Sequence, residues 1–97
     1  MINSRQRAQL RGLANTVPPI YQIGKAGLND ELLRQMDGAL NNREIIKITV
    51  LETCPEDARR LCERCSEILK AEQVQVIGRK FVLYRESKDH KAIELVK

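Results

Sequence analysis

The sequence predicts an α/β fold, a two-layer sandwich in which helices pack on a mixed sheet of about four strands. Segments with apolar residues three and four positions apart alternate with short β-branched runs, in the order α-β-α-β-α-β-β. This alternation implies some parallel pairing, whereas the last two strands lie close enough in sequence to form an antiparallel hairpin. The 97 residues show no internal repeat or low-complexity linker. We therefore expect one domain over residues 1–97, with a core at about 4–85.

The N-terminal segment predicts a helix that starts at Ser4, a residue type suited to the N-cap, and ends near Asn15. Pro18 and Pro19 stop this helix and bias the chain toward an extended course. Ile20–Ile23 is therefore predicted to be a short strand. The helix would bury one apolar stripe, formed by Leu10, Leu13, Ala14 and Val17.

The second helix has clear start signals, with Asn29 as the N-cap and Asp30 and Glu31 in the first turn, where carboxylates favour the positive end of the helix dipole. It is expected to end near Leu40. The β-branched run Ile45–Leu51 predicts the second strand. The positions expected to be buried in these two elements are Leu33, Met36, Leu40, Ile46, Ile48 and Val50.

A third helix is predicted from about Pro55 to Ala71, because Thr53 and Glu56 have the spacing of a capping box. Strands are predicted at Val74–Ile77 and Phe81–Arg85.

Gly78 and Arg79 separate these last two strands. Glycine at the first central position suits a type II′ turn, so the tip of the hairpin is expected to be basic. Residues 86–97 are mostly charged. They either fray or dock through the apolar side chains of Ile93, Leu95 and Val96.

Three cysteines raise the question of a metal or redox site. An odd number of thiols, with no export signal, favours reduced cysteines over disulfides. A tetrahedral zinc site needs four ligands, and the one histidine, His90, lies in the charged C-terminal segment. We therefore expect core packing, without a metal or cofactor, and keep metal or redox chemistry as the alternative. The cysteines are Cys54, Cys62 and Cys65, and the apolar face of the third helix is Ala58, Leu61, Cys62, Cys65, Ile68 and Leu69.

A GxxG loop, Gly24-Lys25-Ala26-Gly27, joins the first strand to the second helix. Both glycines lack a Cβ, so the backbone can approach a phosphate closely, and the free N–H groups of the helix start favour anions. Lys25 adds a cation, and Ala26 is too small to block the approach. The alternative is a turn that only reverses the chain direction.

The formal net charge of +4 arises in one part of the chain. Residues 1–29 contain four basic residues and no acidic one, whereas the rest of the chain carries 13 of each sign. A local positive field attracts a polyanion, since each neutralised phosphate releases counterions. A solvated basic helix face is the alternative, and Asp30 and Glu31 oppose the field. The four basic residues are Arg5, Arg7, Arg11 and Lys25.

Other function classes fit less well. No apolar stretch approaches the ~20 residues that cross a bilayer, and no secretory signal is recognisable, so a cytoplasmic protein is expected. Catalysis is not expected, because the loop lacks the GxxxxGK[ST] pattern and His90 has no evident partner. No long apolar stripe calls for a dimer, which favours a monomer. The only aromatic residues are Tyr21, Phe81 and Tyr84, too few for a base-stacking platform, so a nucleic-acid partner would be recognised through its backbone.

Four segments together resemble the CRM domain, the YhbY-like family of RNA-binding proteins. They are SRQRAQLRGLA, IGKAGL, LNNREIIKITVL and VQVIGRKFVLYR, which occur in the family's order. The resemblance implies a fold similar to the C-terminal domain of a bacterial translation initiation factor. It also implies RNA binding through the GxxG loop and nearby basic residues, and association with precursors of the large ribosomal subunit during ribosome biogenesis. The cysteine-rich third helix and the acidic pair after the loop depart from the family pattern.

The leading hypothesis is a protein that is not an enzyme and that binds structured RNA, with ribosomal RNA in large-subunit precursors as its partner. The alternative is an adaptor for an acidic protein, because electrostatics alone does not distinguish the two polyanions. Lys47 also fits the solvent-facing side of its strand. The candidate RNA contacts are Gly24, Lys25, Ala26 and Gly27 in the loop, Arg5, Arg7 and Arg11 on the first helix, Lys47 on the second strand, and Arg79 and Lys80 in the final hairpin.

Overall fold

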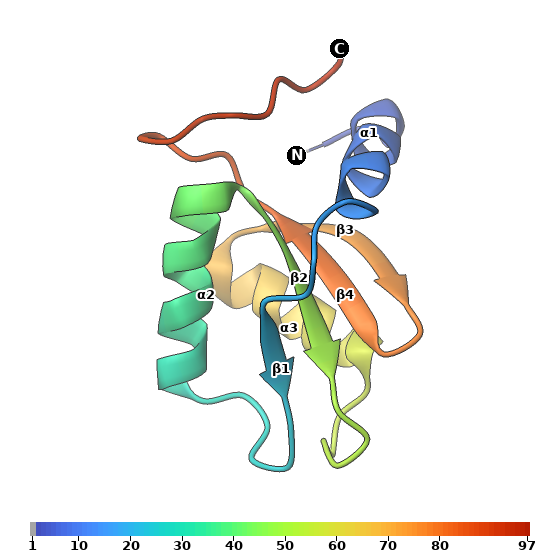
Figure 1. The fold of residues 1–97 in the computed structure, drawn as a ribbon, viewed down its shortest axis with the longest axis vertical. Coiled ribbons are helices and arrows are strands. Elements are labelled where there is room, and N and C mark those ends of the chain that lie inside the picture. Colours follow the sequence, from blue (N-terminus) through green and yellow to red (C-terminus); the bar gives the residue numbers. More distant parts are fainter. Residues whose placement is uncertain (1) are drawn as a thin grey trace.

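The computed structural model describes residues 2–97 and contains three helices and one four-stranded sheet (Figure 1). The strand order is β1-β2-β4-β3, in which β1 pairs with β2 in parallel and β4 is antiparallel to both of its neighbours. The predicted fold class and element order are confirmed. The elements are α1 (Ser4–Ala14), β1 (Tyr21–Ile23), α2 (Asp30–Arg43), β2 (Ile45–Val50), α3 (Ala58–Leu69), β3 (Glu72–Ile77) and β4 (Lys80–Tyr84).

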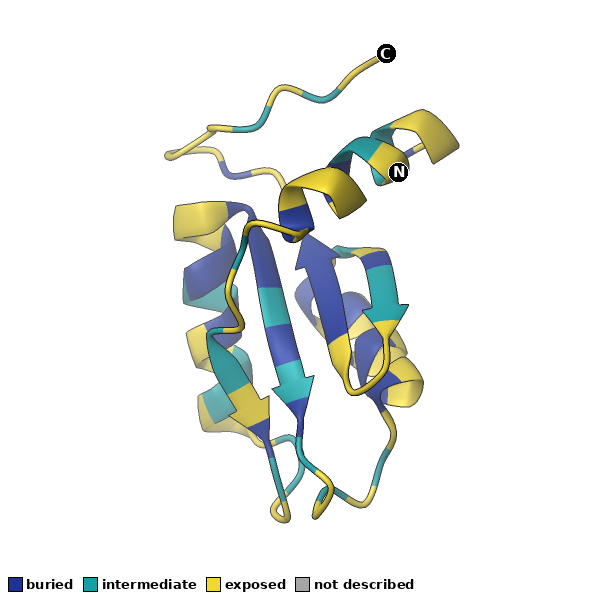
Figure 2. Cartoon of the chain, turned by 45° about the vertical axis from the view of Figure 1, so that its right-hand side comes forward, coloured by how far each residue is buried: buried dark blue, intermediate teal, exposed yellow. Residues whose placement is uncertain are grey.

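The sheet separates two apolar clusters. Helices α2 and α3 cover one face, where the larger cluster joins side chains from both helices to alternate residues of the strands. Helix α1 packs on the opposite face near one end of the sheet, through Leu10 and Ala14 (Figure 2). None of the helices formed by residues 2–97 is long and apolar enough to span a membrane. The central strands supply Ile46, Ile48, Val50, Phe81 and Leu83 to the larger cluster and Ile45, Val82 and Tyr84 to the smaller one.

The cap of α1 differs from the prediction. The N-cap is Asn3, one residue before Ser4, and its Oδ1 accepts from the backbone N–H of Gln6 at 2.8 Å. Gln6 Oε1 accepts from the N–H of Asn3 at 2.9 Å, which completes a capping box. Asn3 and Gln6 have the residue types and the spacing of a capping box, whereas Ser4 has no such partner three residues later. The predicted N-cap of α2, Asn29, is confirmed.

Helix α3 starts later than predicted. Its N-cap is Asp57, whose Oδ1 accepts from the N–H of Arg60 at 2.8 Å, so the capping box predicted for Thr53 and Glu56 is wrong. The shift leaves residues 51–57 as a connection beside the GxxG loop. The predicted buried face is confirmed apart from Ile68, which is 53% exposed.

The cysteines of α3 pack in the core. Cys62 and Cys65 are fully buried in the larger cluster, and burial raises the pKa of these thiols to about 11 and about 12. Residues 2–97 contain no group of three or more His, Cys, Asp or Glu side chains that could hold a metal ion. Cys54 precedes the helix and is half-buried.

We predict that thiol alkylation distinguishes these cysteines. Iodoacetamide at about pH 8 should modify Cys54 and spare Cys62 and Cys65, because the thiolate is the reactive form and both helix thiols are shielded. Intact mass should show one adduct on the native protein and three in denaturant. A Cys54→Ser variant should show none until it unfolds, and rapid double labelling of that native variant would contradict the assignment.

Candidate nucleic-acid interface

The GxxG loop is a tight turn at the end of β1. The N–H of Gly27 donates to the carbonyl of Gly24 at 2.9 Å, and Gly27 has a φ of +70°, in the left-handed region that favours glycine. A Cβ on Gly24 would lie 3.3 Å from Leu51 Cδ1, so glycine permits close packing against the connection after β2. Lys25 and Ala26 form the exposed tip, and their backbone N–H groups make no hydrogen bond within residues 2–97. The tip can therefore donate to an external anion.

A hollow of about 380 Å³ lies between the loop and the first turns of α2. Its rim includes Lys25, Asn29 and Glu31. The Glu31 carboxylate pairs with Arg34 at 2.9 Å and also accepts from Gln35 Nε2 at 3.2 Å. Because the Arg34 guanidinium offsets part of its charge, Glu31 opposes the field of Lys25 less than the sequence suggested.

The β3–β4 hairpin brings two more cations to the same end of the sheet. Arg79 lies in the turn, and its carbonyl accepts from the N–H of Val50, the last residue of β2. Since Val50 is paired with Ile23 on β1, only one strand separates Gly24 from Arg79, which places their backbones about 10 Å apart. Gly78 has a φ of +58° and Arg79 does not have a positive φ, as a type II′ turn requires. Lys25, Arg79 and Lys80 thus share one end of the sheet.

Lys47 and Lys80 project from the sheet face that α2 and α3 leave free. Lys47 is paired with Val82 and Lys80 with Thr49, so the two lysines are diagonal neighbours with Cα atoms about 7–8 Å apart. The register also puts Gln22 beside Thr49. We call the uncovered part of this side the open face, and it consists of Gln22, Lys47, Thr49, Gln75, Ile77 and Lys80.

The open face includes polar residues that were not predicted from the sequence. Gln22, Thr49 and Lys80 form one row across three strands, and neither Gln22 nor Thr49 was proposed as a contact. Strict alternation with Ile23 and Ile48 was the available signal, because residues between buried positions of a strand face the other side. The six residues of the open face include no acidic side chain.

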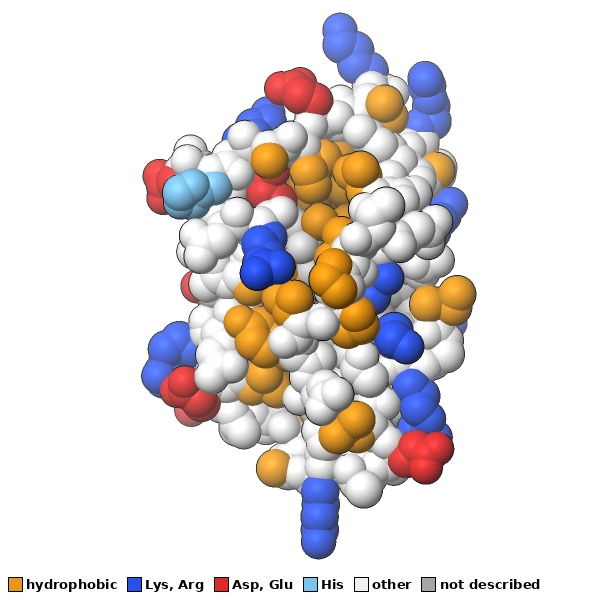
Figure 3. All heavy atoms as spheres, in the orientation of Figure 1, with side chains coloured by type: hydrophobic (Ala, Val, Ile, Leu, Met, Phe, Trp, Pro, Cys, Tyr) orange, Lys and Arg blue, Asp and Glu red, His pale blue; other side chains and the backbone are white. Residues whose placement is uncertain are grey.

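The arginines of α1 lie far from the loop. The molecule is 39 Å long, and α1 and the GxxG loop occupy opposite ends of this axis (Figure 1). Residues 15–23 run along the sheet between them, so the basic segment that is continuous in sequence is divided in space. Basic side chains are seen at both ends of the molecule and along one side of it (Figure 3). The open face with Lys47 and Lys80 connects the two ends.

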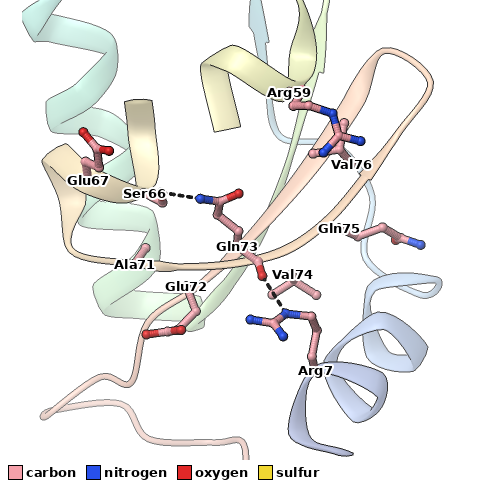
Figure 4. Close-up of a pocket in the computed structure, with 10 residues that line it drawn as sticks. All are labelled: Arg7, Arg59, Ser66, Glu67, Ala71, Glu72, Gln73, Val74, Gln75 and Val76. Atoms are coloured by element: carbon pink, nitrogen blue, oxygen red, sulfur yellow. Dashed lines mark hydrogen bonds between the residues drawn. The ribbon is translucent and has the colours of Figure 1, made fainter. Parts of the chain in front are cut away.

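Arg7 has a partner within the protein. Its Nε donates to the carbonyl of Gln73 at 3.1 Å, on the free edge of β3 (Figure 4). Gln73 also donates through Nε2 to Ser66 Oγ at 3.2 Å, across a hollow of about 620 Å³ between this edge and α3. These contacts and the β-bulge between Gln73 and Gln75 protect the edge from pairing with another chain. We therefore attribute the contacts in this hollow to protection of the sheet edge. Arg5 and Arg11 are better candidates than Arg7 for contacts with an external partner.

The chain is similar to known proteins over nearly its whole length. The model of the CRS1 / YhbY (CRM) domain matches residues 2–85. The Probable RNA-binding protein YqeI of Bacillus subtilis is 42% identical over 98% of this chain and 99% of its own length. A Haemophilus influenzae RNA-binding protein is 34% identical over 93% of this chain and 91% of its own. The solution structure of a hypothetical protein from Staphylococcus aureus is 47% identical, with a TM-score of 0.83, over 99% of this chain and 100% of that protein. The chain belongs to the CRS1 / YhbY (CRM) domain family.

Proposed function

We propose that this protein binds structured RNA through the phosphate backbone, as a cytoplasmic monomer without catalytic activity. The observation that carries the proposal is the exposed loop tip, where two unpaired backbone N–H groups and the Lys25 ammonium share one end of the sheet with Arg79 and Lys80. Peptide N–H groups and ammonium groups bind phosphate oxygens without reading base identity. The RNA-binding relatives support the same class of ligand.

The position of the aromatic side chains supports recognition of the backbone. Phe81 and Tyr84 are buried, and the Tyr21 hydroxyl donates to the carbonyl of Gln35 on α2 at 3.3 Å. The open face therefore offers cations and amides but no ring on which a base could stack. An RNA helix that touches the loop and hairpin could continue over Lys47 toward α1.

We further propose that the RNA is ribosomal RNA in precursors of the large subunit. This part rests on the resemblance to YhbY-like proteins. In a gradient of cell extract at low salt, the protein should sediment with large-subunit precursors. Recovery only at the top of the gradient would overturn the ribosomal assignment and leave RNA binding itself intact.

A salt titration tests RNA against the alternative of an acidic protein partner. We predict that log K for a structured ribosomal RNA fragment falls linearly with log salt, with a slope of about −0.9 for each phosphate contact, by analogy with duplex DNA. Polyglutamate of similar length serves as the comparison. Binding to polyglutamate that equals or exceeds binding to RNA at each salt concentration would favour the adaptor.

A further inference from the structure

Glu44 is a buried carboxylate at the junction of α2 and β2. It has a φ of 67°, it is fully buried, and its oxygens accept from the N–H groups of Ser87 at 2.7 Å, Ala92 at 2.7 Å and Ile93 at 2.9 Å. Burial opposes its ionisation, but these three hydrogen bonds and the charge of Lys91 together hold the pKa of the carboxyl below its usual value. One side chain thus fixes both ends of the turn at residues 87–93.

The chain beyond this turn is attached to α1. Gln9 Nε2 donates to the carbonyl of Glu94 at 2.8 Å, and Gln9 Oε1 accepts from the N–H of Val96 at 2.9 Å. Gln6 Nε2 donates to the carbonyl of Val96 at 2.8 Å. Ile93 and Leu95 pack on the cluster that holds α1 to the sheet. We call residues 87–96 the C-terminal strap, which Figure 1 shows crossing the end of the molecule near α1.

Helix α1 has few other constraints. It is 11 residues long, too short to be stable alone in water, and only Leu10 and Ala14 within it are buried. The family model matches residues 2–85, so the strap lies beyond the matched segment. It nevertheless provides three of the hydrogen bonds that hold α1 in place.

We propose that Glu44 is a positioning residue, which acts through the C-terminal strap to orient α1 so that Arg5 and Arg11 contact the RNA bound at the loop. This inference rests on the proposed RNA-binding function. A basic helix held in one orientation binds with a smaller entropic cost than one that must be ordered on contact. The strap therefore contributes to RNA affinity without needing to touch RNA.

The test uses Glu44→Gln in the full chain. A glutamine has one acceptor oxygen, so its NH₂ group would face at least one strap N–H, and the turn should detach in part. We expect RNA affinity to fall about three- to tenfold, the cost of ordering one or two side chains. Electrostatics alone predicts a gain in RNA affinity, because the change removes a negative charge. Glu94→Gln, an exposed strap residue, is the matched control and should bind at least as tightly as the parent.

A double-mutant cycle shows whether Glu44 acts through the arginines. Combining Arg5→Ala and Arg11→Ala should weaken binding and reduce the salt slope by about two. Adding Glu44→Gln to that pair should then have little further effect. Gln9→Ala, which breaks two strap contacts and leaves Glu44 intact, should reproduce the loss. All binding is measured where circular dichroism shows each variant folded.

The outcomes separate this inference from the proposed function. If Glu44→Gln and Gln9→Ala both bind like Glu94→Gln while Lys25→Glu is weakened, RNA binding stands and the role of the strap is wrong. Full additivity of Glu44→Gln with the arginine pair would also overturn it. If neither Lys25→Glu nor the arginine pair alters binding, the proposed function itself fails.

Discussion

Replacing Lys25 with Glu should reduce affinity for a structured ribosomal RNA fragment roughly tenfold or more, the equivalent of one charge-assisted hydrogen bond. Lys25 is exposed at the tip of the GxxG turn. The substitution puts a carboxylate where a phosphate would bind, beside the free N–H groups of the tip. The salt slope should also fall by about one. Filter binding or fluorescence anisotropy across a salt series measures both quantities.

The matched control is Lys70→Glu. Lys70 is an exposed lysine that directly follows α3. It lies at the end of the sheet opposite the loop, because the carbonyl of its neighbour Leu69 accepts from Arg85, which follows β4. Both variants carry the same net charge, so a difference between them reports position rather than overall charge. Equal weakening by the two substitutions would mean that the protein attracts RNA through a diffuse field, and the loop would lose its assigned role. The melting temperature of Lys25→Glu should match that of the parent, since no contact is lost.

The sequence predicted the fold through signals that are local. Alternation in Ile45–Leu51 placed Ile46, Ile48 and Val50 in the core, and the structure confirms this. Asn29 was confirmed as a cap because its partner, the N–H of Leu32, is only three residues away. The prediction of a helix cap failed where two candidate residues lay close together, as with Ser4 beside Asn3. Short-range competition between similar residues decides such boundaries, and propensity alone does not resolve it.

The sequence predicted which residues belong to the candidate site but not how they are arranged in space. The turn of the GxxG loop depends on two glycines in sequence, which a pattern can reveal. The distance from the loop to α1 depends on how residues 15–23 run along the sheet, and the role of Glu44 depends on residues more than 40 positions later. A glutamate after a helix gives no sign that it will accept three distant amides. Contacts of this range arise only from the packed tertiary structure.

Arg85 shows the same limit, because the sequence placed it only at the end of a strand. Its Nη1 donates to Asp37 Oδ1 at 2.9 Å and to the carbonyl of Leu69 at 2.7 Å. Its Nη2 donates to the carbonyl of Asp37 and to Asn41 Oδ1, each at 3.0 Å. One guanidinium thus ties β4 to the last turns of α2 and α3, where a cation also complements the helix dipoles.

Arg85→Ala should therefore lower the free energy of unfolding by about 2–4 kcal/mol, because it leaves part-buried acceptors without a donor. For a domain of this size, that corresponds to a drop of roughly 10–25 °C in melting temperature. The free energy of unfolding of Arg85→Lys should lie between those of Arg85→Ala and the parent, since an ammonium keeps the charge but cannot span all four acceptors. Arg34→Ala is the control, because its pair with Glu31 is exposed on both sides and should contribute less than about 1 kcal/mol. If thermal unfolding shows equal losses of stability for Arg85→Ala and Arg34→Ala, Arg85 does not hold α2 and α3 to the sheet. If Arg85→Ala binds RNA like the parent well below its melting temperature, Arg85 acts on stability alone, unlike Lys25.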